Sequence, residues 1–185
     1  TGSSTSPPFA CARPWRQRRR SWKASAGPCA GSPPSPSHPS SHGHGPPVRQ
    51  QAPLKHCWKA SHSHCRWVHG YSIAVSFKFG AKELDDRNWV QDFGGLKPIK
   101  AWLKKNFDHT TCISEDDPEL ETFKSLKEKD IIDLNIMPGV GCEKFAEYIY
   151  NHVSEIIDKD SEGRVWLESV EVLEHGANSA IFSRD

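Results

Sequence analysis

Residues 69 to 79 carry the pattern that most limits how this chain can fold. Large side chains at the odd positions alternate with small or polar ones at the even positions. Side chains two positions apart lie on one face of an extended strand. The segment is therefore predicted to be a strand with one buried face, formed by His69, Tyr71, Ile73, Val75, Phe77 and Phe79.

The segments after this strand predict a small α+β domain. Apolar residues at helical spacing predict two main helices, and alternating or apolar stretches predict further strands. The expected elements are a strand at 88–93, a helix at 96–107, a shorter helix after Pro118, an extended segment at 130–137, a helix at 142–158 and a strand at 164–176. This order is typical of an antiparallel sheet with the helices on one face.

Residues 1–53 differ in composition from the rest of the chain. They hold 11 of the 14 prolines and none of the 23 acidic residues. Such a segment buries too little apolar surface to offset the entropy of ordering it, so we expect it to be disordered. The "HGH" at His42–His44 is expected to carry no function, because Pro46 and Pro47 deny it a strand. The folded domain is predicted to span residues 54–185.

Three roles stay open for this front segment. It is poor in acidic residues and rich in serine and arginine, as an organellar transit peptide is. Its arginine run at 16–20 also suits a basic arm for nucleic acid. The third alternative is an extension without function.

The composition excludes some classes of protein. No run of about 18 apolar residues occurs, so no membrane span is predicted. The six cysteines show neither paired zinc-finger spacing nor the pattern of a small secreted disulfide framework. We expect reduced thiols in a cytoplasmic protein.

Three histidines and a cysteine fall within residues 62–69. Cys65 lies four positions before His69, so a nearby imidazole and a metal ion would both favour its reactive thiolate. His62, His64 and His69 are candidate ligands for zinc, which takes about four ligands in a tetrahedron. The alternative is a buried structural cysteine among solvated histidines.

Two further places carry candidate chemistry. Asp108 and His109 end the first predicted helix, where a carboxylate can orient an imidazole for proton transfer; a plain surface pair is the alternative. Glu174 continues the apolar row of Val170 and Val172 on one strand face. A carboxylate there suits the N–H-rich edge of a pterin or guanine ring, unless the strand has already reached water.

Four motifs together resemble the 6-pyruvoyl-tetrahydropterin synthase and 6-carboxy-tetrahydropterin synthase family. They are "CRWVHGY", "WVQDFGGLKPIKAWLKKNFDH", "GCEKFAEYIY" and "VEVLEHG", and the likeness runs over about residues 57–185. The resemblance implies a tunnelling fold, in which subunits join sheet edges into a barrel, as a hexamer made of two trimers with active sites between subunits. The carboxy branch of the family, which feeds queuosine and other deazapurines, is the more similar one.

The resemblance also implies a reaction and its residues. The substrate would be 7,8-dihydroneopterin triphosphate and the product 6-carboxy-5,6,7,8-tetrahydropterin, formed by a zinc-dependent lyase. Cys65, Asp108 and His109 match the family's catalytic residues, Glu174 matches its pterin anchor, and Glu143 matches a second glutamate near the pterin. Relatives read "HGH" where this chain has His69, Gly70 and Tyr71, so zinc is expected on His69 and His64 with His62 or Tyr71 as a further ligand.

Three other functions remain as alternatives. A 6-pyruvoyl-forming synthase would share these motifs. A pterin-binding relative without catalysis would explain Tyr71. A nucleic-acid-binding module would need the basic front segment, because residues 83–185 are rich in acidic side chains.

Overall fold

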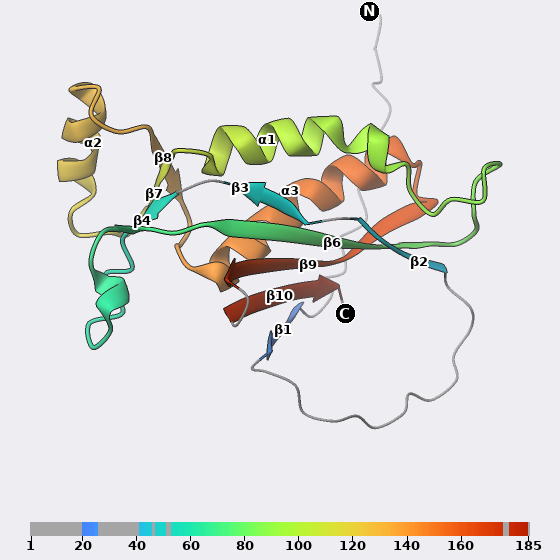
Figure 1. Ribbon diagram of the computed structural model, residues 1–185, viewed down its shortest axis with the longest axis horizontal. Helices are drawn as coiled ribbons and strands as arrows, with labels where there is room; N and C mark the ends of the chain where they lie inside the picture. The colour runs from blue at the N-terminus through green and yellow to red at the C-terminus, as the bar shows by residue number, and fades with distance from the viewer. Residues whose placement is uncertain (1–19, 26–40, 46, 51–52, 176–177, 185) are drawn as a thin grey trace, which may run out of the picture.

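The computed structural model of this 185-residue chain describes residues 20–25, 41–45, 47–50, 53–175 and 178–184 (Figure 1). The expectation of disorder for the remainder of residues 1–53 lies outside the described residues.

The main sheet confirms the predicted antiparallel architecture. Its strands run in the order β1-β10-β9-β6-β2, and β3 also pairs with β6 (Figure 1). Every pairing is antiparallel. The six strands are β1 (Arg20–Ser25), β2 (Ser41–His44), β3 (Val48–Gln50), β6 (Ile73–Ala81), β9 (Val165–His175) and β10 (Asn178–Arg184).

A second sheet of four short strands adjoins the first. Its order is β5-β4-β7-β8, and the β4–β7 and β7–β8 pairings are parallel. The strands are β4 (Leu54–Lys55), β5 (His69–Gly70), β7 (Thr111–Ser114) and β8 (Leu134–Met137). The strand predicted at residues 69–79 is therefore divided at Tyr71 and Ser72, where the chain passes from the second sheet to the main one.

The predicted helices are confirmed. Their bounds are α1 (Lys97–Phe107), α2 (Leu120–Glu128) and α3 (Cys142–Asp160), with two 3-10 turns, η1 (His64–Arg66) and η2 (Phe93–Leu96). Apolar residues of α1 and α3 join one core with the odd-numbered residues of β6. Both main helices thus cover the same face of the main sheet, as predicted.

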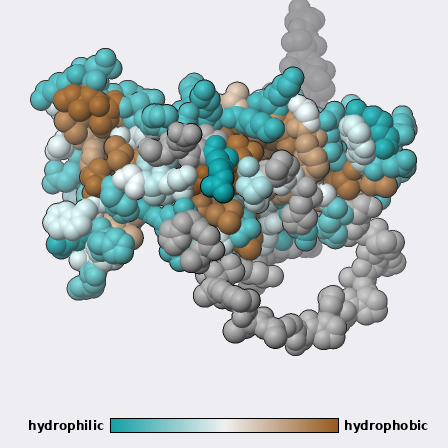
Figure 2. Space-filling view, viewed as in Figure 1, coloured by the Kyte–Doolittle hydropathy of each residue, from teal (hydrophilic) through white to brown (hydrophobic). Residues whose placement is uncertain are grey.

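The short helix α2 covers a smaller core of its own. Ile113, Phe123 and Leu134 form this second cluster. Apolar surface remains visible at the end of the molecule that carries α2 (Figure 2), where Ile131 is 62% exposed.

The strand predicted at residues 88–93 is wrong. The Asp85 side chain accepts hydrogen bonds from the backbone N–H groups of Arg87 and Trp89, and the Asp92 side chain accepts one from Gly94. The aspartate oxygens thus accept hydrogen bonds from backbone N–H groups that would pair with a neighbouring strand. Such side-chain to backbone hydrogen bonds favour turns over strands. The segment forms a loop that leads into η2.

Disorder is also a wrong prediction for three short segments of the front region. Residues 20–25 pair with β10, and residues 41–44 and 48–50 pair with β6. Strand pairing needs backbone hydrogen bonds more than apolar side chains, so composition alone did not reveal it. Pro46 and Pro47 follow the strand at His42–His44 and do not interrupt it.

No helix among the described residues is long and apolar enough to cross a membrane.

Candidate active site

A cavity of about 680 Å³ lies where the two sheets meet. Its walls come from β4, the segment that leads into η1, the amino end of α3, and the ends of β9 and β10. The polar and sulfur-bearing side chains that line it include Lys55, Cys57, Lys59, Cys65, Cys142, Glu143, Lys144 and Glu174. Cys65, Glu143 and Glu174, which sequence analysis placed in the site from three separate motifs, thus line one cavity.

Lys55 and Glu174 form an ion pair on the cavity wall. The Lys55 Nζ atom lies 2.9 Å from Glu174 Oε1, and Lys55 is only 4% exposed. Burial lowers the pKa of Lys55, but the hydrogen bond and charge of Glu174 outweigh it and leave that pKa above its ordinary value. The lysine is therefore a buried cation that joins the second sheet to the main one.

Tyr71 lies beneath this cation. The Lys55 Nζ atom is 4.1 Å from the centre of the tyrosine ring, a cation–π contact. The ring also stacks on Phe145, with centroids 6.2 Å apart. The Tyr71 hydroxyl oxygen is buried without a hydrogen-bond partner, and burial raises the pKa of Tyr71 above its ordinary range. The phenol is thus held in its neutral form.

Three thiols face the cavity. Ser63 caps η1 by accepting the backbone N–H of Cys65, and the Cys57 N–H donates to the Cys65 carbonyl oxygen at 3.3 Å. Burial raises the pKa of Cys57, and it raises the pKa of Cys142 to about 12. Those two thiols are poorly suited to act as nucleophiles or bases at neutral pH.

The amino end of α3 positions Glu143. Gly141 precedes the helix with a φ of 119°, a conformation that a residue with a side chain adopts only under strain. Glu143 then lies in the first turn, where the helix dipole favours a carboxylate. This glycine therefore sets the direction in which the chain enters the cavity wall.

Sequence analysis missed Lys55, Cys57 and Cys142 as site residues. A signal for the first two was present, because Lys55 and Cys57 are two positions apart and share a face if the chain is extended. This signal could be used only if a strand was expected in the segment "APLKHC". The proline and the two-residue length of β4 gave no such indication.

Asp108 and His109 form a pair away from the cavity lining. Their Oδ1 and Nδ1 atoms are 3.2 Å apart, and the His109 side chain is 75% exposed. The backbone N–H of Asp108 donates to Lys104 and ends α1. The pair is formed as predicted, but it does not line the cavity that holds Cys65, and its catalytic role stays a prediction.

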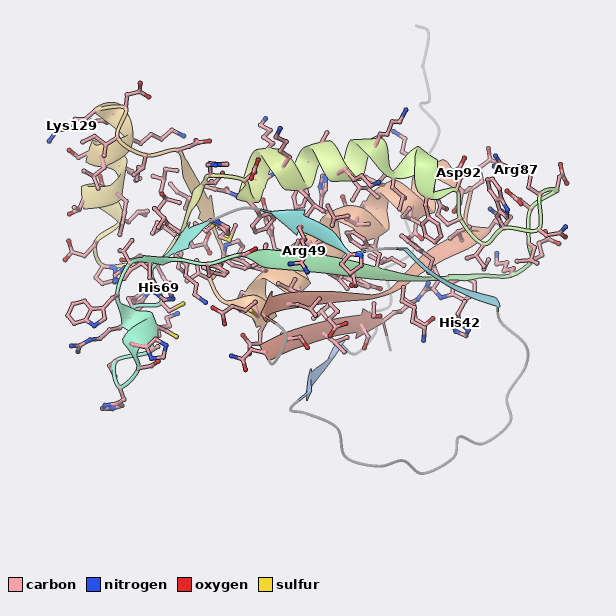
Figure 3. All side chains as sticks on the ribbon, in the orientation of Figure 1. His42, Arg49, His69, Arg87, Asp92 and Lys129 are labelled. Atoms are coloured by element: carbon pink, nitrogen blue, oxygen red, sulfur yellow. The ribbon has the colours of Figure 1, made fainter. Side chains whose placement is uncertain are left out.

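The predicted zinc ligands lie around η1. The rings of His64 and His69 are 6.4 Å apart, and those of His69 and Tyr71 are 6.3 Å apart. His69 Nδ1 lies 2.7 Å from the Trp67 carbonyl oxygen, so the assigned tautomer donates there and leaves Nε2 as a ligand. His62 is exposed. Figure 3 shows His69 at the end of the molecule that carries η1.

These side chains do not by themselves form a zinc site. Within the described part of the chain, no three His, Cys, Asp or Glu side chains are grouped so as to hold a metal ion. Tyr71 would need to ionise to bind zinc strongly, and its raised pKa opposes this. We therefore assign no chemical step to zinc.

The fold and cavity define a class of protein: a two-sheet α+β domain with thiols, two carboxylates and a buried ion pair around one ligand-sized cavity. A family model described as 6-pyruvoyl tetrahydropterin synthase matches residues 48–185. The chain belongs to this family. The match begins a few residues before the expected domain start at residue 54.

Two kinds of relatives agree with this assignment. Proteins of Rickettsia bellii and Rickettsia felis named 6-carboxy-5,6,7,8-tetrahydropterin synthase are 33% identical over 57 residues. That alignment covers 30% of this chain and 41% of each relative. Proteins with such names are enzymes of the lyase type.

Two solved structures share the fold. A crystal structure of an uncharacterised Wolinella succinogenes protein has a TM-score of 0.68 at 18% identity, over 80% of this chain and 100% of that one. The 6-pyruvoyl tetrahydropterin synthase of Plasmodium falciparum has a TM-score of 0.57 at 18% identity, over 79% of this chain and 99% of that one.

Proposed function

We propose that this protein converts 7,8-dihydroneopterin triphosphate to 6-carboxy-5,6,7,8-tetrahydropterin, the precursor of queuosine and other deazapurines. The observation that carries the proposal is the shared cavity of Cys65, Glu143 and Glu174. These residues come from three distant parts of the sequence, and the family resemblance assigns each of them to the site. The names of the Rickettsia relatives favour the carboxy product over the pyruvoyl one.

The cavity suits a pterin in size and chemistry. Its volume of about 680 Å³ falls in the range of ordinary small-molecule sites. Glu174 pairs with the Lys55 cation at 2.9 Å, and its carboxylate oxygens can accept hydrogen bonds from ring N–H groups of the ligand. Lys59 and Lys144 also line the cavity, and their charges favour a substrate that carries a triphosphate.

Cys65 is the proposed proton-transfer residue. It is partly exposed and lines the cavity together with Glu174, so a pterin held by Glu174 brings its side chain toward the thiol. General acid–base catalysis by one such group contributes about 10²–10⁴-fold to a rate. The Asp108–His109 pair lies outside this cavity, and we propose that it serves the cavity of a neighbouring subunit.

The protein is proposed to act as a homo-oligomer, a hexamer made of two trimers. This follows from the family resemblance, in which subunits join sheet edges and place the sites between subunits. An Asp108–His109 pair that is formed but lies away from its own cavity supports such an arrangement.

A second candidate function is pterin binding without catalysis. Tyr71, a neutral phenol with a buried hydroxyl at the position of a family zinc ligand, favours it. Zinc dependence stays a prediction, and the zinc content of the purified protein, compared with that of His69→Ala, belongs to the same experiment.

The experiment supplies the zinc-treated protein with 7,8-dihydroneopterin triphosphate and identifies the products by mass spectrometry. We expect 6-carboxy-tetrahydropterin, acetaldehyde and triphosphate, and a loss of rate of about 100-fold or more in Cys65→Ala. Cys112→Val is the matched control, because Cys112 is buried in β7 outside the cavity lining. If the folded wild-type protein binds pterin but leaves the substrate unchanged, the second function is the correct one. If Cys65→Ala converts the substrate at the wild-type rate, the role assigned to the thiol is wrong.

A further inference from the structure

The proposed function uses Glu174 to bind the ligand ring but gives Lys55, its partner in the ion pair, no contact with the ligand. The Lys55 side chain is buried and that of Glu174 is partly buried. Taking such charges out of water costs free energy that their attraction only partly offsets, so the pair by itself is weak evidence for a stabilising role. Here the pair lines a cavity of about 680 Å³, so both charges face a place where a ligand can bind.

The hydrogen-bonding capacity of Lys55 is only partly used. A lysine ammonium has three N–H donors. One reaches Glu174 Oε1 at 2.9 Å, and the ammonium also lies over the Tyr71 ring. The Tyr71 hydroxyl takes none of these bonds, so donor capacity remains toward the cavity. The Tyr71 ring contacts the Lys55 ammonium on one side and stacks on Phe145, which fixes the position of the ring.

Glu174 and Lys55 together present acceptors and a donor side by side. The carboxylate accepts hydrogen bonds, and the ammonium 2.9 Å away donates them. One edge of a 2-amino-4-oxopyrimidine ring has the complementary order: the 2-amino group and the ring N3–H donate, and the 4-oxo group accepts. This edge is shared by pterins and guanine.

We propose that Lys55 is a specificity-determining residue of this site, which donates to the 4-oxo group while Glu174 accepts from the 2-amino and N3 positions. The inference rests on the proposed function and deepens it, because it names the chemical edge that the site reads. A ring with a donor in place of the 4-oxo group would face the lysine cation and be rejected.

The test measures binding of three ring probes by fluorescence titration of the full chain. Pterin has the complete edge, 2,4-diaminopteridine replaces the 4-oxo group by an amine, and lumazine replaces the 2-amino group by an oxo group. The wild-type protein is expected to prefer pterin to 2,4-diaminopteridine by about 100-fold, since hydrogen bonds to charged groups are strong.

In Lys55→Met the preference for pterin over 2,4-diaminopteridine is expected to fall at least tenfold, while the preference over lumazine is unchanged. The lumazine comparison keeps the 4-oxo group and so reports on Glu174 alone. Lys78→Met is the matched control: Lys78 forms a similar ion pair with Glu168 at 2.9 Å but does not line this cavity, and the variant should keep both preferences.

Lys55→Met leaves the partly buried Glu174 carboxylate without the lysine cation and can destabilise the protein. A second comparison therefore uses two variants without the Glu174 charge. Glu174→Gln keeps the lysine, and Lys55→Met/Glu174→Gln lacks both charges, so the two differ only at Lys55. The single variant should still reject 2,4-diaminopteridine relative to pterin, and the double variant should not.

The outcomes separate the two proposals. If pterin binds the wild-type protein but the loss of Lys55 changes no preference, the role of Lys55 is wrong and the proposed function stands. If the folded wild-type protein binds no pterin, the proposed function fails and the inference fails with it.

Discussion

At the scale of single residues, burial decides which thiols of this protein can ionise. Cys112 is fully buried in β7, and this raises its pKa from 9.0 to about 12. Its Sγ atom lies 3.8 Å from the Asn106 carbonyl oxygen, a contact that suits the neutral thiol. The folded state therefore holds a proton that the unfolded state releases.

This difference predicts a loss of stability at alkaline pH. A group whose pKa is raised on folding stabilises the protein fully below its unfolded pKa, and the contribution is lost as pH rises toward the folded value. Between pH 9 and pH 12, Cys112 should thus lower the free energy of unfolding by up to about 1.4 kcal/mol per pH unit.

Urea unfolding of the wild type and of Cys112→Val across this pH range checks the prediction. The slope should be shallower in Cys112→Val, which has no group to ionise. Ile113→Val is the control, because it alters the adjacent buried residue and should keep the wild-type slope. Equal slopes in all three proteins would contradict the raised pKa.

Single residues also show what the sequence reveals of the site. Cys65, Glu143 and Glu174 were predictable because each lies in a motif that the family resemblance covers. Lys55 was not, because its burial depends on an ion pair with a residue 119 positions away, and no local pattern encodes that contact. Tyr71 as a metal ligand stays a prediction, and the structure adds a contact that the sequence did not reveal, between its ring and the Lys55 cation.

At the scale of elements, the helices were predictable and the short strands were not. The apolar stripes of α1 and α3 repeat over 11 and 19 residues, long enough for periodicity to be read. The strands β4, β5 and β7 have two to four residues, too few to show any period. They form because neighbouring backbone groups satisfy one another.

One element contact makes a glycine necessary in β6. Gly80 lies opposite Trp166 of β9, and a Cβ atom at Gly80 would come within 2.4 Å of the indole ring. Gly80→Ala should therefore lower the free energy of unfolding by about 1–3 kcal/mol, the usual cost of overpacking.

Gly70→Ala is the matched control for this prediction. A Cβ atom there would lie 3.6 Å from Leu54, an ordinary contact, so the change should stay within about 0.5 kcal/mol, as at most surface positions. Urea unfolding measures both variants. A stable Gly80→Ala protein would show that the indole ring moves freely aside.

At the scale of the whole molecule, β1 has a consequence for assembly. It pairs with β10 along six residues and covers that edge of the main sheet. A paired edge cannot also accept a strand from another subunit. Proposed barrel assembly through this edge therefore requires β1 to leave.

Removal of residues 1–40 should shift the protein toward larger assemblies, because β10 is then exposed while β2 and β3 remain. Native mass spectrometry of the full chain and the shortened chain at equal concentration measures the change. We expect more trimer or hexamer in the shortened chain; a shift toward monomer would mean that β1 supports assembly instead.

The position of the cavity between the two sheets also determines the stage of protein synthesis at which the cavity can form. Lys55 belongs to the first half of the folded domain, while Glu174, Asn178 and Ser179 complete the cavity from β9 and β10. During synthesis Lys55 leaves the ribosome long before Glu174 does, and until then its ammonium group is solvated. Only when β9 and β10 have left the ribosome can the cavity close around that charge, so a nascent or truncated chain without these two strands lacks the cavity.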